Sequence, residues 1–422
     1  MATLSHKISI YLRSSGASLL STAVNKAAGF ASIWLLNRIL TKGAYGNYEF
    51  AFTIVSLLLL VGSGGLNHAV MYRLSRLDTP PEEMDGHDFA GAALGWSLIV
   101  SCVFTTGVVL GAPYIEMLAG NEDLAFWISL LAFLIPTRVA RGVYQSWYKA
   151  RQCIPEAIIM GNVFPTIGKV LLLVGVWVGW PTPEGVVLAV LVSELIPTLV
   201  WYVRTPVNPL NLTGHLSRWD VGYAAKLAVT QGLGRTLRNA DVLMVGFLTV
   251  AERTAEYVVA AKIALLLGVG HGILARVLHP RIGRFLSQKR WESLFREYDQ
   301  TRSIALAFAL GGACVLALVG KTVLGIFGDY SAAYPILIVL AANRVAAVSY
   351  GMCDGYLSIA GYAGWRLMAT MSILTLNLFL NYLLISVYGA MGAAVATLIS
   401  YLLIKSLVVY VIYRLDGVMV YS

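Results

Sequence analysis

The stretch "RVARGVYQSWY", residues 138–148, recurs late in the chain as "RVAAVSYGMCD", residues 344–354, at a shift of 206 residues. Both copies keep Arg-Val-Ala and a tyrosine six positions after the arginine. Two more pairs of segments recur in the same order and at nearly the same shift, among them "GVVLAVLVSEL" from Gly185 and "GAAVATLISYL" from Gly392. Three ordered matches indicate that the chain holds two copies of one structural unit in tandem.

The composition indicates what kind of unit this is. Of the 422 residues, 58% are hydrophobic and only 13% are charged, and the mean hydropathy is +0.72. A soluble domain of this length would need more charge on its surface, and apolar runs of about 20 residues, enough to cross a bilayer, follow one another throughout. The chain is therefore predicted to be an all-α polytopic membrane protein. Its four cysteines lie far from any CxxC or Cys/His spacing, so we expect neither disulfides nor zinc.

Twelve transmembrane helices fit the pattern, in two pseudo-symmetric lobes of six. The expected spans are 15–38, 47–69, 89–111, 122–146, 156–179, 185–203, 221–247, 255–276, 303–325, 333–358, 367–386 and 390–412. Residues 1–203 form the N-terminal lobe, 204–220 the cytoplasmic linker and 221–422 the C-terminal lobe. Parallel repeats of this kind characterise alternating-access transporters, which bind their substrate between the lobes.

Lysine and arginine are distributed unequally between the two sides of the membrane. One set of loops holds most of them, whereas the other holds Lys42, Arg253 and several acidic residues. By the positive-inside rule, the basic loops and both termini are cytoplasmic. The net charge of +9 is thus largely an orientation signal, and we expect no nucleic acid as a partner.

The segment "HPRIGRFLSQKRWESLFREYDQTRS", residues 279–303, has the pattern of an amphipathic cytoplasmic connection. Two interpretations are open. Either its apolar residues lie on the membrane while its arginines meet anionic headgroups, or it is a solvated linker helix. The apolar residues concerned are Ile282, Phe285, Leu286, Leu294 and Phe295.

Ionisable residues inside the expected spans carry the functional signal. Those near mid-span are Lys26, Lys169, Glu194, Arg235, Arg238, Asp241, Lys262 and Arg344, and those in the cytoplasmic third are Arg138, Arg141, Lys226, Asp354 and Lys405. Snorkelling to headgroups explains most of the second set, whereas a mid-span charge must face a cavity or a partner. Asp241 is placed to pair with Arg238, three residues earlier, and Glu194 to neutralise one further base.

The bases that are left over predict a water-filled cationic cavity between the lobes, because a dry interior would not tolerate unpaired charges. Its natural occupant is an anion, and the planar fork of arginine suits phosphate oxygens. Lys26 and Arg235 are repeat mates at a shift of 209 residues, and Arg138 and Arg344 are mates at 206. Both lobes would therefore contribute cations at similar depth.

Three stretches carry a family resemblance: "NRILTKGAYGNYEFAFTIVSLLLLVGSGGLNHAVMYRLSR" (37–76), "ADVLMVGFLTVAERTAEYVVAAKI" (240–263) and "NLFLNYLLISVYGAMGAAVATLIS" (377–400). With the spacing of the spans, they resemble polysaccharide-type flippases of the Wzx kind, in the multidrug/oligosaccharidyl-lipid/polysaccharide (MOP) exporter superfamily. The resemblance implies a two-lobed fold that alternates between inward-open and outward-open states. The implied substrate is an undecaprenyl-pyrophosphate-linked oligosaccharide repeat unit, moved across the bacterial inner membrane for O-antigen, capsule or exopolysaccharide synthesis. Membrane lipids surround such a protein, and polysaccharide polymerase and chain-length machinery are further candidate partners.

The resemblance also implies site residues, since family members carry basic residues for the pyrophosphate in the central cavity. The matching candidates are Lys26, Arg235, Arg238 and Arg344, with Arg138 and Arg141 at the cytoplasmic mouth. The family's use of an ion gradient makes Asp241, Glu194 and Asp354 candidate proton or sodium sites, although all three would equally serve to neutralise arginines. Tyr144 and Tyr350 are candidates for stacking on sugar rings, with interfacial anchoring and core packing as alternatives. No bound cofactor is expected.

Two other functions compete with a flippase. A multidrug or cation antiporter of the same superfamily would share the fold, but its cavity should be anionic or neutral. A membrane glycan polymerase or ligase should carry catalytic residues on a large extracytoplasmic loop, and outer loops such as "GWPTPEG" (179–185) are too short for one. The sequence also lacks GxSxG, HExxH and phosphate-binding-loop motifs, which favours a transporter over an enzyme.

Overall fold

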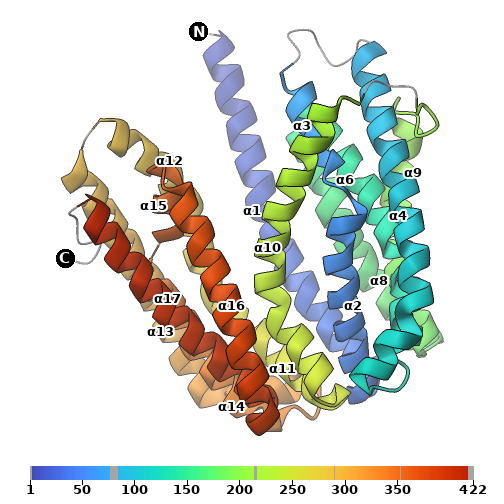
Figure 1. The fold of residues 1–422 in the computed structure, drawn as a ribbon, viewed down its shortest axis with the longest axis vertical. Helices are drawn as coiled ribbons and strands as arrows, with labels where there is room; N and C mark the ends of the chain where they lie inside the picture. The colour runs from blue at the N-terminus through green and yellow to red at the C-terminus, as the bar shows by residue number, and fades with distance from the viewer. Residues whose placement is uncertain (1, 77–83, 213–215, 289, 352, 417–422) are drawn as a thin grey trace. The chain divides into compact units, whose positions relative to one another are not determined.

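The structure of the protein, a computed structural model, describes residues 2–76, 84–212, 216–288, 290–351 and 353–416. Throughout that part of the chain the regular structure is helical and contains no β-strand (Figure 1). The chain divides into two compact units, unit 1 (Met1–Gly232) and unit 2 (Leu233–Ser422). The all-helical class predicted from composition is therefore confirmed.

The helices follow one another with short connections. Those that begin in unit 1 are α1 (Ala2–Ile39), α2 (Lys42–Gly62), α3 (Leu66–Leu74), α4 (Met84–Ala119), α5 (Leu124–Leu131), α6 (Leu134–Ala150), α7 (Ile154–Ile158), the π-helical turn η1 (Ile159–Val163), α8 (Phe164–Gly179), α9 (Pro183–Arg204) and α10 (Arg218–Leu248). Those of unit 2 are α11 (Ala251–Ala264), η2 (Leu265–Gly268), α12 (Val269–Ser287), α13 (Trp291–Phe327), η3 (Ser331–Ala333), α14 (Tyr334–Ser349), α15 (Cys353–Ile359), α16 (Ala363–Tyr388) and α17 (Ala390–Asp416).

Within the described residues, nine helical stretches are long and apolar enough to cross a membrane, from His87–Ala119 in unit 1 to Ala390–Leu415 in unit 2. Each overlaps one of the spans predicted from the sequence. The other three predicted spans fall on α1, α2 with α3, and α10, which are helical as well. The protein is a multi-pass membrane protein, while the total of twelve spans and the cytoplasmic location of both termini stay predictions.

Several spans that look continuous in the sequence are interrupted helices. The span 47–69 breaks between α2 and α3, where Gly64 and Gly65 have φ angles of 53° and 72°, a conformation that glycine adopts without strain. The span 122–146 breaks between α5 and α6, and 156–179 contains the turn η1. Irregular backbone inside a membrane is tolerated where protein or a polar cavity satisfies it, and of these interruptions η1 carries the polar side chain of Asn162.

Helix boundaries repeat as the sequence does. α1 and α10 end at Ile39 and Leu248, and α2 and α11 begin at Lys42 and Ala251, in both cases 209 residues apart. α8 and α16 end at the same shift, and α9 and α17 begin 207 residues apart. The two units therefore share one order of helices, with the shift that the repeated sequence motifs show.

The predicted linker, residues 204–220, packs tightly on α4 where the structure describes it. The carbonyl oxygens of Asn208 and Pro209 lie so close to Gly91 and Gly95 that a Cβ atom on either glycine would come within 2.6 Å and 2.3 Å of them. Only glycine permits this approach at the two positions. The segment therefore packs across α4 as part of unit 1, and we call it the strap.

The start of α10 is also held by unit 1. Asp220 forms an ion pair with Arg73 of α3 at 3.0 Å and accepts a hydrogen bond from the hydroxyl of Ser217 at 2.7 Å. The division between the two compact units falls further along the same helix, between Gly232 and Leu233. α10 therefore begins in one unit and ends in the other.

Where the structure describes it, the segment 279–303 forms the end of α12 and the beginning of α13. Ile282 and Leu294 are 0% and 1% exposed and belong to a core cluster that includes Tyr356 and Leu357 of α15. Arg281 and Glu297 form an ion pair at 3.0 Å between the two helices. Ile282 and Leu294 thus pack in the core of unit 2 and do not lie on the membrane, while for the rest of the segment the two interpretations stay predictions; the side chain of Leu286 lies outside the described residues.

Candidate functional site

The candidate site of unit 1 is organised by α6. Arg138, Arg141 and Gln145 follow one another at intervals of three and four residues, which places them along one face of the helix. The helix begins after the break that follows α5, and Thr137 secures this start by donating its hydroxyl to the carbonyl of Phe133 (3.2 Å). α6 therefore presents a polar face made of two cations and an amide.

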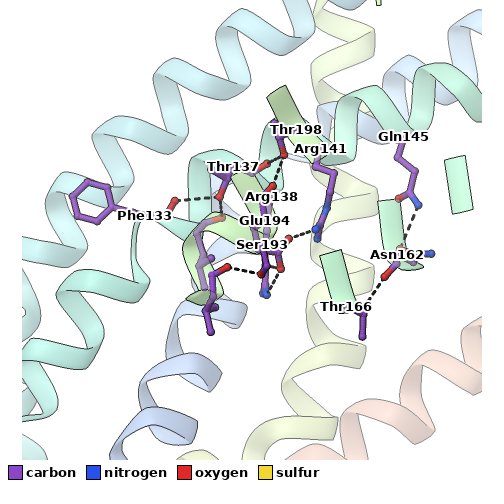
Figure 2. A network of polar contacts seen from close by, with 12 residues as sticks. Phe133, Thr137, Arg138, Arg141, Gln145, Asn162, Thr166, Ser193, Glu194 and Thr198 are labelled. Atoms are coloured by element: carbon purple, nitrogen blue, oxygen red, sulfur yellow. Dashed lines mark hydrogen bonds and ion pairs between the residues drawn. The ribbon is translucent and has the colours of Figure 1, made fainter. Parts of the chain in front are cut away.

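Glu194 of α9 holds both arginines (Figure 2). Arg138 donates from Nε (3.0 Å) and Nη2 (2.7 Å) to Oε1 of Glu194, and Arg141 donates from Nη1 to Oε2. The side chains of Arg138, Arg141 and Glu194 are 17%, 18% and 10% exposed, so the cluster is mostly withdrawn from the surface. Two cations around one anion leave a formal charge of +1.

Glu194 does not use up the donors of the arginines. Each guanidinium has five N–H donors, and only two N–H groups of Arg138 and one of Arg141 point at the carboxylate. The other donors form a forked surface of the kind that binds phosphate or carboxylate oxygens. The Arg138 guanidinium also lies over the ring of Phe52, 4.9 Å from its centroid, which helps to fix its plane. The arginine pair is thus suited to a further anion.

A second cluster of polar side chains lies beside the arginines and consists of Gln145, Asn162 and Thr166 (Figure 2). We call this cluster the amide group, after the side chains of Gln145 and Asn162. Gln145 donates from Nε2 to the carbonyl of Ala157 (3.0 Å) and to Oδ1 of Asn162 (3.4 Å), and Thr166 donates its hydroxyl to the carbonyl of Asn162 (2.7 Å). Asn162 lies in the π-helical turn η1. Such turns inside α-helices are frequent at functional sites, because they redirect side chains.

Unit 2 holds a carboxylate in different surroundings. Asp241 of α10 accepts hydrogen bonds at Oδ2 from the hydroxyls of Tyr257 (3.0 Å) and Thr397 (2.7 Å), and at Oδ1 from Nδ2 of Asn381 (2.9 Å). Asn377 accepts from Asn381 (3.0 Å) and donates to Thr397 (3.2 Å), which closes the network. Among the described residues, the hydrogen-bond donors to Asp241 are therefore all neutral side chains.

The pair that the sequence suggested between Arg238 and Asp241 does not form. Among the residues that the structure describes, Asp241 makes no ion pair, and Arg238 is exposed on α10. The reason is that α11, α16 and α17 supply donors to both carboxylate oxygens, which turns the short side chain toward those helices. Helical spacing alone overstated the attraction between the two residues.

The third acid, Asp354, neutralises a base. Lys405 of α17 has a side chain only 5% exposed and donates to Asp354, whose side chain is 48% exposed. Lys405 therefore does not snorkel toward headgroups, as the sequence suggested, because its charge is compensated inside the protein. In the same unit, Nε of Arg344 is buried and has no hydrogen-bond partner among the described residues.

The chain matches the family described as "Polysaccharide biosynthesis protein" over residues 11–286, well over half of its length. It belongs to that family. The family resemblance seen in the sequence is thereby confirmed.

Curated relatives and solved structures agree with this membership. The chain is similar to the probable low-salt glycan biosynthesis flippase Agl15 of Haloferax volcanii, at 20% identity over 376 residues that cover 88% of this chain and 77% of the relative. It is 22% identical over 353 residues to the succinoglycan biosynthesis transport protein ExoT of Rhizobium meliloti, which covers 79% of this chain and 66% of the relative.

The fold is that of the MOP superfamily. The inward-facing structure of a multidrug resistance MATE family transporter superposes with a TM-score of 0.75 at 14% identity, over 94% of this chain and 98% of that one. The lipid II flippase MurJ in an inward closed conformation gives 0.73 at 12% identity, over 94% and 87%. At these identities the likeness concerns the fold alone.

Of the residues that the sequence assigned to a pyrophosphate, the structure of this family member brings Arg138 and Arg141 together. Lys26 is exposed on α1 and Arg238 on α10, while Arg235 is half-buried and has an interaction partner of its own. The role of each as a phosphate ligand stays a prediction. Arg138 and Arg141, which the sequence assigned to the mouth of the cavity, are thus the candidates that share a common partner, the carboxylate of Glu194.

The two tyrosines proposed for sugar stacking differ in their surroundings. Tyr144 is 2% exposed, and its ring packs in the core with the ring of Trp201, 6.3 Å between centroids. Its faces are therefore covered, which favours the core-packing alternative. Tyr350 is half-buried, with its hydroxyl 2.7 Å from that of Ser406 and its ring edge-on to Tyr401.

The neutral polar residues of both networks were not anticipated from the sequence. Asn377 and Asn381 stand four residues apart in a mostly apolar helix, and Gln145 follows Arg141 at the same spacing. That spacing is the signal for a shared helix face. A search for amides as well as charges would have found them.

Proposed function

We propose that the protein is a flippase that translocates undecaprenyl-pyrophosphate-linked oligosaccharide repeat units across the bacterial inner membrane by alternating access, for O-antigen, capsule or exopolysaccharide synthesis. The observation that carries this proposal is the arginine pair, Arg138 and Arg141, which shares the single carboxylate of Glu194 inside membrane-spanning helices and keeps donors free for an anion. A charge in such a place is costly and is retained where function needs it. Relatives named as a glycan biosynthesis flippase and a succinoglycan transport protein support the substrate class.

The arginine pair argues against the competing antiporter of cationic drugs. A site with a formal charge of +1 repels a lipophilic cation, whereas a pyrophosphate would gain charge-assisted hydrogen bonds from both guanidiniums. The fold itself does not separate the two functions, because a MATE transporter and MurJ resemble the chain about equally. The charge of the site therefore supports the flippase over the antiporter.

Ion coupling is proposed to use Asp241. Glu194 and Asp354 are held in ion pairs with arginine and lysine, whereas Asp241 has only neutral donors. Oδ1 of Asn381, beside it, is buried without a hydrogen-bond partner among the described residues. Either a sodium ion or a proton on Asp241 would satisfy this arrangement, since carboxylate, amide and hydroxyl oxygens are suitable ligands for a hard cation.

The first test is the binding of undecaprenyl pyrophosphate to the purified protein, measured by native mass spectrometry, with a lipophilic cationic dye as the contrasting ligand. The test variant is Arg138→Gln/Arg141→Gln/Glu194→Gln, which removes the cationic pair without leaving a bare carboxylate. We expect it to bind the lipid at least about tenfold more weakly than wild type, because charge-assisted hydrogen bonds contribute about 1.5–3 kcal/mol each.

The matched control is Arg281→Gln/Arg302→Gln, which removes two arginines from ion pairs of α12 and α13, outside the arginine pair. It should bind like wild type. Equal lipid binding by wild type and the triple variant would make the arginines structural. Preference of the wild type for the dye would overturn the proposal in favour of drug export.

A further inference from the structure

We propose that the amide group, Gln145, Asn162 and Thr166, is a subsite for the hydroxyl groups of the sugar that is attached to the phosphate. This inference rests on the proposed function and deepens it, because it names residues that would distinguish a glycosylated lipid from a bare lipid phosphate. The subsite would recognise one sugar residue through hydrogen bonds, without an aromatic platform.

The backbone around the subsite is built to bring two amides together. The π-helical turn η1 lies between α7 and α8 and carries Asn162. Gly161 leaves room for the end of Gln145, since a Cβ atom there would come 2.5 Å from Nε2 of Gln145 and 3.1 Å from the ring of Trp201. Pro165, which lacks an N–H, ends the turn on the other side. The contact between Gln145 and Asn162 thus depends on local features of the sequence.

The amide group keeps hydrogen-bonding capacity that the protein does not use. Nε2 of Gln145 donates to Ala157 and Asn162, so Oε1 of Gln145 is available as an acceptor. The two N–H groups on Nδ2 of Asn162 are available as donors. Thr166 donates to the backbone and keeps its lone pairs. Asn162 is exposed, and Gln145 and Thr166 are partly so. A sugar hydroxyl both donates and accepts hydrogen bonds. It can therefore donate to Oε1 of Gln145 and accept from Nδ2 of Asn162.

The position of the amide group relative to the arginines indicates which sugar of the oligosaccharide it would bind, namely the one attached to the phosphate. Gln145 follows Arg141 by four residues, or about 6 Å along the helix. A phosphate held by the arginine pair therefore places the first sugar, one bond away, beside the amides. The core position of Tyr144 points the same way, because its buried ring has no face to offer a sugar.

The amide group consists of polar side chains within membrane spans, where exposure to hydrocarbon is costly. Asn162 and Thr166 belong to the apolar span Ile154–Gly179, and Gln145 belongs to Leu124–Ala150. Exposing an amide to hydrocarbon costs several kcal/mol. A substrate with many hydroxyl groups, or the water that accompanies it, removes that cost.

The test measures the affinity of wild type and variants for matched lipids: undecaprenyl pyrophosphate alone, and the same lipid carrying one glucose, galactose or N-acetylglucosamine. Wild type should bind at least one glycosylated lipid more tightly than the bare one. Gln145→Leu/Asn162→Leu should weaken binding of that lipid by about tenfold, the loss expected for one or two hydrogen bonds, and should leave binding of the bare lipid unchanged.

Two more variants separate recognition from folding. Gly161→Ala keeps every polar group but pushes the flexible end of Gln145 aside, so it should lower the same preference in part. Thr166→Val tests the hydroxyl, with Thr106→Val of α4 as its control, since both hydroxyls donate to a carbonyl four residues earlier in their own helix. Only the first should change the preference for the glycosylated lipid.

The outcomes distinguish this inference from the proposed function. Tight binding of the lipids by wild type with no effect of the amide variants, or with equal weakening of bare and glycosylated lipid, would overturn the subsite and leave the flippase standing. Failure of wild type to bind any of the lipids would remove both. Loss of bare-lipid binding only in the arginine variants, and of sugar preference only in the amide variants, would support both.

Discussion

The carboxylate of Glu194 in unit 1 accepts three hydrogen bonds, all of them from arginine, whereas the carboxylate of Asp241 in unit 2 accepts three from tyrosine, threonine and asparagine. Glu194 lies on α9, which is long and apolar enough to cross a membrane, and Asp241 lies on α10, which is predicted from the sequence to do so. The charge of Glu194 is more than neutralised by its hydrogen-bond partners, whereas the donors that the described part of the chain supplies to Asp241 are neutral. This difference is why Asp241, rather than Glu194, is the carboxylate proposed for ion coupling.

The difference also breaks the symmetry of the repeat. Tyr401 stands at the repeat position of Glu194, 207 residues later, and Ser32 stands at that of Asp241, 209 residues earlier. Arg344, the mate of Arg138, thus lacks the carboxylate that Arg138 has, and its Nε is buried without a hydrogen bond among the described residues. The two units share one order of helices, whereas the proposed anion site lies in the first and the proposed coupling site in the second.

The largest effect on stability is expected for Glu194→Gln, which removes the carboxylate charge that pairs with the two arginines. Removing one partner of a buried ion pair leaves the other uncompensated and costs about 3–5 kcal/mol, and here two guanidiniums lose the same partner. We expect a marked fall in thermal stability of the detergent-solubilised protein, measured as the midpoint of unfolding. The triple variant Arg138→Gln/Arg141→Gln/Glu194→Gln should recover much of it, because no charge is then left unpaired. A Glu194→Gln protein as stable as wild type would contradict the ion-pair cluster.

A smaller effect is expected for Asn381→Leu in unit 2. Asn381 is 0% exposed and donates to Oδ1 of Asp241 and to Asn377. Loss of a hydrogen bond to a charged group costs about 1.5–3 kcal/mol, and leucine fills a similar volume, so packing changes little. The control on the same helix is Thr370→Val, whose hydroxyl donates only to the carbonyl of Arg366. Equal unfolding midpoints for Asn381→Leu and Thr370→Val would mean that the amide does not support the carboxylate.

Much of the fold could be predicted from the sequence, because it depends on long-range regularities. Apolar runs gave the helices, and three repeated motifs gave the order of helices in both units. What escaped prediction depends on single close contacts. The strap over α4 exists because Gly91 and Gly95 admit the carbonyls of Asn208 and Pro209, and no hydrophobic pattern encodes that approach. The breaks at Gly64 and Gly65 were missed for the same reason.

The site was predicted as a set of charges but not as a set of contacts. The sequence identified Arg138, Arg141 and Glu194 without indicating that they meet, since Glu194 lies more than 50 residues from either arginine. It also treated Asp241 as a neighbour of Arg238, because local spacing is visible in a sequence whereas donors from α16 and α17 are not. Charge count predicts the chemistry of a buried site, and tertiary packing decides which acid is paired.

The smallest effect on stability, and the sharpest test of the comparison, is expected for Asp241→Asn. An asparagine keeps one acceptor for Asn381, and its new amide can donate to the hydroxyl of Thr397 or Tyr257, because a hydroxyl both donates and accepts. The free energy of unfolding should therefore change by less than about 1 kcal/mol, far less than for Glu194→Gln. Transport in vesicles should nevertheless lose its dependence on an imposed sodium or proton gradient, since the ionisable group is gone. A variant still driven by the gradient would exclude Asp241 as the coupling site, and one as unstable as Glu194→Gln would show that Asp241, too, is a structural charge.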